Sequence, residues 1–275
     1  MKRLIPLLLL ITACGTGRTG AVYFPSPQGR IHVDDGGTGP KLPLMFIHGN
    51  GGNLTQWQAQ LAHFRKTRRA VAMDLRGMGI SDPPANGEYT IEAMADDIHD
   101  VANSLGLDRF VIVGHSFGAA VVARYAAKYP ERIAGVVYAD AAGDVTVGAE
   151  QAEKFLTALR MDKKKVAGEW FEPILREAKP EVKALVLLSV DRTSTEAFTE
   201  SLEEILTFQM KKNVEAYRGP KLAIAAASSE KKTALHVQLP SIPSRTISGV
   251  SHWLMMDRPE EFNRQMEIFL AEIEK

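Results

Sequence analysis

Ser116 lies in a pentapeptide whose spacing could make a serine reactive. Residues 114–118 read Gly-His-Ser-Phe-Gly, with one glycine two residues before the serine and one two residues after it. The apolar residues 110–113 predict a short buried strand, and the small residues after the pentapeptide predict a closely packed helix. A serine on such a strand-to-helix turn presents its hydroxyl at a helix N-terminus, which favours developing negative charge. Ser116 is therefore a candidate nucleophile.

A nucleophilic serine needs an imidazole to take its proton and a carboxylate to orient that imidazole. His252 is the candidate base among the seven histidines, because it follows the last predicted strand, 245–248, at the sheet edge where Ser116 also lies. We expect His115 to point away from the reacting serine and His48 to support a neighbouring loop. The other histidines are expected to have surface or structural roles: His32, His63, His99 and His236.

The carboxylate that would orient His252 is harder to assign. Asp140 directly follows the predicted strand 133–139, and the carboxyl ends of parallel strands meet at one edge of a sheet. This position makes Asp140 the preferred acid. Glu230, which follows the predicted strand 222–227, could also reach His252, and Asp144 is a further alternative.

Apolar strands alternate with helical patterns along much of the chain, which is typical of a mostly parallel sheet. From about residue 145 to 213 only helical patterns occur, so we predict an insertion there. The predicted fold class is α/β, with a mostly parallel doubly wound sheet and a helical cap inserted before the last two strands. The predicted division is a signal peptide at 1–13, a tether at 14–25, a core at 26–143 and 214–275, and a cap at 144–213.

Four motifs resemble those of the α/β-hydrolase superfamily, in the order in which that family carries them. They are an oxyanion loop at His48-Gly49-Asn50-Gly51, a turn from Asp74 to Asp82, a nucleophile elbow at Gly114 to Gly118, and a catalytic-histidine loop at Gly249-Val250-Ser251-His252. The resemblance covers nearly all of the chain after the predicted signal peptide. It implies that the backbone N–H groups of Asn50 and Phe117 stabilise a tetrahedral oxyanion, while Asp74, Arg76 and Asp82 are structural.

The resemblance implies a serine hydrolase that cleaves a carboxylic ester through an acyl-serine intermediate. Dehalogenases and epoxide hydrolases of the family attack with aspartate, so Ser116 argues against both reactions. Most members carry the acid after the next-to-last strand, where this chain has Ser228, Ser229 and Glu230, and this departure puts the acid in doubt. The alternatives are hydrolysis of a carbon–carbon bond, an amide or a lactone, a cofactor-free perhydrolase, or a noncatalytic membrane-tethered ligand-binding protein.

The first residues are typical of an exported protein. Lys2 and Arg3 precede the apolar run 4–11, which is shorter than the roughly 20 residues that span a bilayer. Cys14 is the only cysteine, and residues 11–14 resemble the lipobox of bacterial lipoproteins. We expect lipidation of Cys14 and a membrane anchor; the alternative is an ordinary signal peptide with an incidental cysteine. Because Gly15 follows the cysteine, the resemblance favours the outer membrane, facing the periplasm or the cell surface.

The overall charge points to no polyanionic partner. Thirty-three basic and 33 acidic residues cancel, so nucleic acid is not an expected partner. The basic run Lys163-Lys164-Lys165 is predicted to be a solvated helix face. No metal-ligand spacing or phosphate loop occurs, so no metal or cofactor is expected and the partner is a small acyl substrate. Four cap aromatics are candidates to line its pocket or to pack within the cap: Phe155, Trp170, Phe171 and Phe198.

Overall fold

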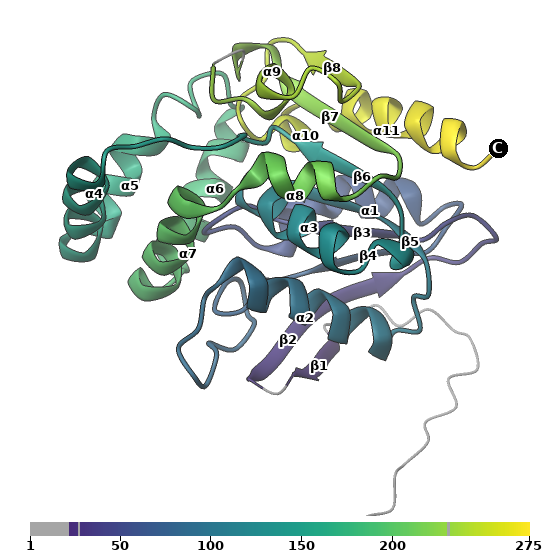
Figure 1. Ribbon diagram of the computed structural model, residues 1–275, viewed down its shortest axis with the longest axis horizontal. Helices are drawn as coiled ribbons and strands as arrows, with labels where there is room; N and C mark the ends of the chain where they lie inside the picture. The colour runs from purple at the N-terminus through teal and green to yellow at the C-terminus, as the bar shows by residue number, and fades with distance from the viewer. Residues whose placement is uncertain (1–21, 27, 230–231) are drawn as a thin grey trace, which may run out of the picture.

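The computed structural model describes residues 22–26, 28–229 and 232–275, which form an eight-stranded sheet with helices on both faces (Figure 1). The strand order is β1-β2-β4-β3-β5-β6-β7-β8. Strands β1 and β2 pair antiparallel, and β2 also pairs antiparallel with β4, whereas β3 to β8 run parallel. The predicted fold class, a mostly parallel and doubly wound sheet, is confirmed. The expected signal peptide, Cys14 and Glu230 lie outside the described residues.

The elements follow one another as the alternating pattern predicts. The strands are β1 Val22–Ser26, β2 Gly29–Gly36, β3 Leu44–Ile47, β4 Ala70–Met73, β5 Phe110–His115, β6 Ile133–Ala139, β7 Lys221–Ala226 and β8 Ser244–Ile247. The α-helices are α1 Gln58–Phe64, α2 Ile91–Ser104, α3 Phe117–Lys128, α4 Ala149–Met161, α5 Lys163–Phe171, α6 Pro180–Arg192, α7 Thr195–Thr207, α8 Met210–Ala216, α9 Leu235–Gln238, α10 Leu254–Asp257 and α11 Pro259–Ile273. Short 3-10 helices are η1 Leu54–Trp57, η2 Pro130–Arg132 and η3 Ala227–Ser229.

The core lies on both faces of the sheet because the central strands are mainly apolar and are buried at every position. All residues of β3, β4, β5 and β6 are buried, as parallel strands covered on two sides require. Helices α2, α3 and α8 contribute to the apolar cluster on one face. Helices α1 and α11 contribute to the cluster on the other face. This double cover fixes the strand ends that carry the candidate site.

Of the five α-helices between β6 and β7, four, α4 to α7, form a group at one end of the sheet (Figure 1). They stand over the edge where Ser116, Asp140 and His252 occur. Helix α8 spans the expected cap boundary at residue 213, but it packs against α3 in the sheet layer. In the described residues, no helix is long and apolar enough to cross a bilayer.

Lys163 is an exception to the predicted solvated face of residues 163–165, and for this residue the prediction is wrong. Its side chain is buried, and the Nζ donates to the carbonyl of Val190 at 2.7 Å and also to that of Thr193. These carbonyls lie at the C-terminal end of α6, where helix carbonyls lack intrahelical partners. Lys163 therefore caps a neighbouring helix, and burial lowers the pKa of its amine.

Candidate active site

The turn from β5 into α3 holds Ser116 in a backbone conformation that side chains rarely adopt. Its φ is +52°, and its backbone N–H donates to Ala139 O at 3.0 Å. A Cβ at Gly114 would overlap the Gly118 carbonyl, and a Cβ at Gly118 would overlap the His48 carbonyl. Both glycines are therefore required by close backbone approach, while the strained serine is fixed at the N-cap of α3.

Sheet register brings Asp140 next to Ser116. His115 of β5 pairs with Ala139 of β6, so the residues that follow these two strands leave the sheet side by side. Asp140 also has a positive φ, +43°, and its N–H donates to Ile224 O at 2.8 Å. Two neighbouring parallel strands thus end in strained residues with chemically useful side chains, as the strand-end argument predicts.

The Asp140 carboxylate contacts the imidazole of His252. Its Oδ2 lies 2.6 Å from His252 Nδ1 and accepts from the Ser229 hydroxyl at 2.8 Å, while Oδ1 accepts from Ala226 N at 2.9 Å. Burial by itself would raise the pKa of Asp140. The hydrogen bond and charge of His252, together with the other two donors, outweigh burial and hold this pKa below its usual value. Asp140 therefore stays ionised, and His252 keeps its Nε2 free for another partner.

Of the other two candidate acids, one lies elsewhere and one is outside the described residues. Asp144 accepts from Lys211 N at 3.0 Å, and so it anchors the start of α8. Glu230 falls outside the described residues. Ser229, whose hydroxyl fixes Asp140, is a site residue that the motifs do not indicate. The only signal was its position after the next-to-last strand, where the sequence offers serines in place of an aspartate.

The two predicted oxyanion donors belong to residues that share a cavity with Ser116. Phe117 is the first residue of α3, and Asn50 lies in the loop after β3; both line the same cavity as Ser116. Neither amide donates a hydrogen bond to any described residue. The side chain of Asn50 has a different role, since its Nδ2 donates to the Phe198 carbonyl of α7 at 2.9 Å.

His48 supports the Asn50 loop, as expected. Its Nε2 accepts from Leu75 N at 3.0 Å, which leaves the Nδ1 proton to be donated to Gly49 O at 2.7 Å. Burial lowers the pKa of His48, so the imidazole stays neutral and keeps this tautomer. The loop is thereby fixed to the turn that follows β4.

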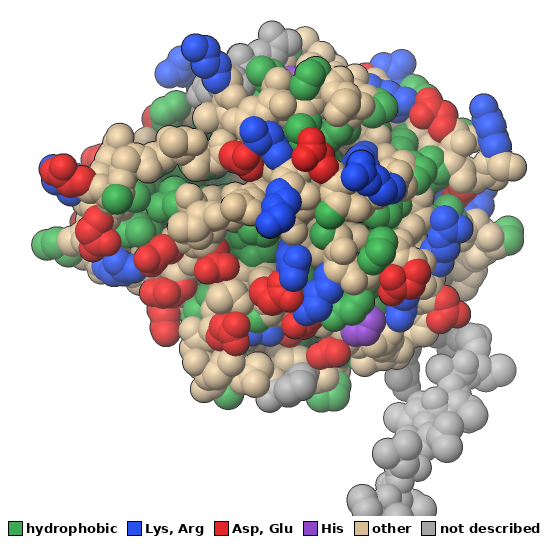
Figure 2. Space-filling model, viewed as in Figure 1, with side chains coloured by type: hydrophobic (Ala, Val, Ile, Leu, Met, Phe, Trp, Pro, Cys, Tyr) green, Lys and Arg blue, Asp and Glu red, His purple; other side chains and the backbone are tan. Residues whose placement is uncertain are grey.

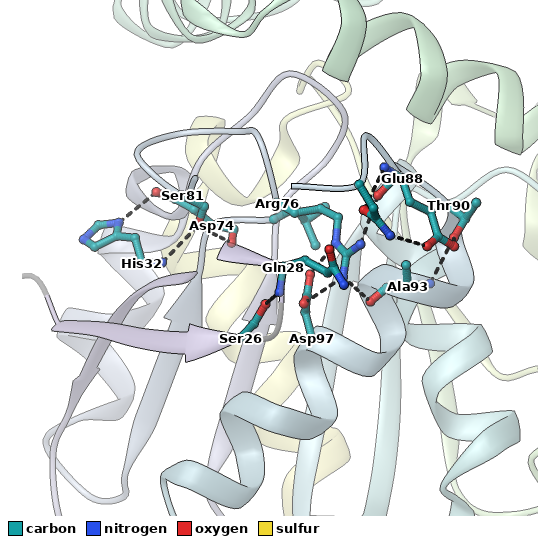
Figure 3. A network of polar contacts seen from close by, with 12 residues as sticks. Ser26, Gln28, His32, Asp74, Arg76, Ser81, Glu88, Thr90, Ala93 and Asp97 are labelled. Carbon is teal, nitrogen blue, oxygen red and sulfur yellow. Dashed lines mark hydrogen bonds and ion pairs between the residues drawn. The ribbon is translucent and has the colours of Figure 1, made fainter. Parts of the chain in front are cut away.

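The turn from Asp74 to Asp82 braces the same region. Figure 3 shows the polar contacts around Asp74 and Arg76. Asp74 accepts from the N–H of Leu54 at 2.6 Å and contacts His32 Nδ1 at 2.8 Å. Arg76 forms a two-pronged ion pair with Asp97 at 2.7 and 2.9 Å. Asp74, Arg76 and Asp82 do not line the cavity. Asp82 instead pairs with Arg30 at 2.9 Å. These contacts agree with the structural role that the resemblance implies for all three residues.

Residues 43–170 match the family described as alpha/beta hydrolase fold. The chain has the α/β-hydrolase fold. An sn-1-specific diacylglycerol lipase of Mus musculus is 25% identical over 98% of this chain and 94% of that protein. Epoxide hydrolase 1 of Caenorhabditis elegans is 35% identical over 40% of this chain, and the match spans only 28% of that relative's length. A thermophilic esterase from Thermogutta terrifontis has the same fold, with a TM-score of 0.80 at 24% identity over 94% of this chain and 100% of that chain.

A cavity of about 550 Å³ opens above Ser116. Helices α4, α5 and α7 form much of its wall, which is mainly apolar and includes Phe155, Trp170 and Leu206. Phe171 and Phe198 instead pack together, with ring centroids 6.2 Å apart, and Phe198 is fully buried. Two of the four candidate aromatics thus line the cavity and two pack behind it.

Four other histidines lie away from this cavity. His32 contacts Asp74, His63 contacts Glu267 at 2.8 Å, and His99 stacks on Tyr129 with ring centroids 4.0 Å apart. His236 lies in the short helix α9 and does not line the cavity.

Proposed function

We propose that this α/β-hydrolase is a serine hydrolase that cleaves carboxylic esters through an acyl-serine intermediate. The observation that carries the proposal is the 2.6 Å contact between His252 Nδ1 and Asp140 Oδ2, at a cavity that Ser116 also lines. The two unused amides, of Asn50 and Phe117, add donors for an oxyanion. The proposal agrees with curated relatives and structural neighbours that are hydrolases, among them a lipase and an esterase.

In the proposed reaction, Ser116 Oγ attacks the ester carbonyl carbon and His252 Nε2 takes the serine proton. The carbonyl electron pair moves onto oxygen, where the Asn50 and Phe117 amides stabilise the negative charge. Collapse of this intermediate breaks the bond to the alcohol oxygen, which leaves with the proton from His252. Water then attacks the acyl-serine by the same route, releasing the acid and restoring Ser116. Asp140 holds the imidazole in one tautomer throughout.

The cavity favours an uncharged substrate with an apolar acyl group. Its lining, in the described part of the chain, contains only two titratable side chains, Asp140 and His252, and neither is a fixed cation that would pair with a substrate carboxylate. A volume of about 550 Å³ is within the range of cavities that hold drug-sized ligands. An acetyl group would leave most of this apolar space unfilled, whereas a medium-length acyl chain would bury its methylenes there.

Hydrolysis of a series of p-nitrophenyl esters, from acetate to dodecanoate, tests the proposed function. We expect kcat/KM to rise about fourfold for each methylene until the cavity is filled. The half-ester of a dicarboxylic acid of matched length should be turned over at least about tenfold less well, because none of the described residues that line the cavity offers its carboxylate a cationic partner. Ser116→Ala should abolish turnover of every ester, whereas the exposed control Ser104→Ala should not change it. Unchanged turnover by the Ser116→Ala variant contradicts the proposal.

We also propose that Cys14 carries lipid and anchors the mature protein to a membrane. The support is the resemblance of residues 11–14 to a lipobox, after a basic and then apolar leader. Several acyl chains would hold the protein firmly, since each buried methylene contributes about 0.8 kcal/mol.

A further inference from the structure

His115, the residue before Ser116, extends away from the reacting serine to the backbone of the histidine loop. Its Nε2 lies 2.9 Å from the carbonyl oxygen of His252. The ring is fully buried, with centroids 4.6 Å from the His252 ring and 5.7 Å from the Trp253 ring. On its other edge lies the Asn50 loop, where a Cβ at Gly49 would come within 3.0 Å of His115 Nδ1. One side chain thus contacts both loops that complete the site.

The hydrogen bond fixes the tautomer of His115. The His252 carbonyl can only accept, so Nε2 carries the proton and donates it. Nδ1 is buried and has no hydrogen-bond partner among the described residues, which leaves it unprotonated. Burial, with the nearby His252, lowers the pKa of His115 to about 3. The ring therefore remains a neutral donor over the pH range in which the enzyme would act, and it does not oppose positive charge on His252.

The backbone of His252 is held at both its N–H and its carbonyl group. Its N–H donates to the Ile174 carbonyl at 3.1 Å, and its carbonyl accepts from His115. The contact with Asp140 fixes only the ring, at Nδ1, whereas these two bonds fix the backbone from which the imidazole extends. Because His115 is the last residue of β5 and Ser116 directly follows it, the bond from His115 ties the base to the strand that presents the nucleophile.

We propose that His115 is the positioning residue of the base: its Nε2–H holds the His252 carbonyl so that the imidazole stays aligned with Ser116. This inference rests on the proposed function. Small misplacements of a catalytic group lower the rate of the chemical step much more than they weaken substrate binding. Loss of the donor should therefore reduce kcat while KM changes little.

A matched pair of variants separates the hydrogen bond from the packing of the ring. Gln and Met are unbranched side chains of nearly the same size, but only Gln places an N–H near the position of the imidazole Nε2–H. We expect His115→Met to lower kcat for a p-nitrophenyl ester about 10- to 100-fold, with KM within about twofold of the parent value. His115→Gln should recover most of this loss. His99→Met, at a histidine remote from the cavity, is the control and should match the parent.

Two readouts keep the inference distinct from the proposed function and from a folding defect. Thermal unfolding and circular dichroism identify the folded variants, and the rate of fluorophosphonate labelling reports on the nucleophile without a second chemical step. Equal kcat and equal labelling rates in folded Met and Gln variants would overturn the role of His115 while the proposed function stands. A parent protein that neither labels nor hydrolyses esters would overturn both.

Discussion

At the scale of single residues, the site depends on two strained positions at the ends of paired strands. Ser116 and Asp140 have φ values of +52° and +43°, and a backbone hydrogen bond from each residue's N–H fixes it to the next strand. The sequence predicted Ser116 from its glycine spacing and Asp140 from its place after an apolar run. Ser229 could not be predicted, because its hydroxyl reaches Asp140 only through the way the chain folds after β7.

Replacing Asp140 by Asn tests its role as the acid. The amide of Asn would either present an N–H group to His252 Nδ1, which holds the imidazole in the wrong tautomer, or lose its contact with the imidazole. We expect kcat/KM for esters to fall by up to about 10⁴-fold, with the fold retained. Steady-state kinetics of the Asp140→Asn variant would reveal the loss. A fall of less than about threefold would show that another group orients His252.

The lowered pKa of Asp140 also predicts how stability depends on pH. Because the folded state favours the carboxylate, its contribution to the free energy of unfolding is complete above the usual aspartate pKa of about 3.9. That contribution is lost as pH falls through the lower pKa of the folded state. The difference in unfolding free energy between the parent and Asp140→Asn, measured in urea from pH 7 to 3, should therefore be constant near neutrality and shrink below about pH 3.9.

At the scale of elements, the cap is joined to the Asn50 loop by specific contacts. Asn50 Nδ2 donates to Phe198 O of α7, and Asn53 Nδ2 donates to Ser189 Oγ of α6 at 2.8 Å. The helical patterns of residues 145–213 predicted the cap helices but not these bonds, since a periodic pattern shows which face is apolar and not which neighbour it meets. The same limit explains Lys163, which a run of three lysines does not distinguish from its solvated neighbours.

Lys163→Met should destabilise the cap. The substitution keeps the apolar stem but leaves the carbonyls of Val190 and Thr193 without this buried donor. Hydrogen bonds to charged groups contribute about 1.5–3 kcal/mol, so we expect a loss of stability of this size. Chemical denaturation checks it, with Lys164→Met as the matched control because its side chain is 82% exposed. Equal stability of the two variants would show that Lys163 does not cap α6.

At the scale of the whole molecule, the alternation of apolar strands and helices predicted the sheet and the place of the insertion. The order of strands in space, with β4 between β2 and β3, depends on long-range pairing and required the structure. Basic and acidic side chains are interspersed over the face drawn in Figure 2, as the balanced composition predicts. This mixture is consistent with the expectation of a small-molecule substrate.

The proposed lipid anchor predicts where the molecule is found. Expressed in a Gram-negative bacterium, the full chain should partition with the membrane fraction and enter the detergent phase. Cys14→Ser should move it to the soluble fraction or leave the leader uncleaved, because the thiol that carries lipid is absent. Metabolic labelling with an alkyne fatty acid provides the second measurement. A parent protein that takes up no label contradicts the anchor.

The most direct test of the central claim is the mass of the protein after treatment with a fluorophosphonate. Trypsin releases residues 110–124 as one peptide, in which Ser116 is the only hydroxyl-bearing side chain. The proposed roles of Ser116, His252 and Asp140 predict one adduct on this peptide in the parent protein and none in Ser116→Ala. In His252→Gln the adduct should form slowly. An unmodified peptide 110–124 in the parent, or equal labelling of the Ser116→Ala protein, would contradict an acyl-serine mechanism.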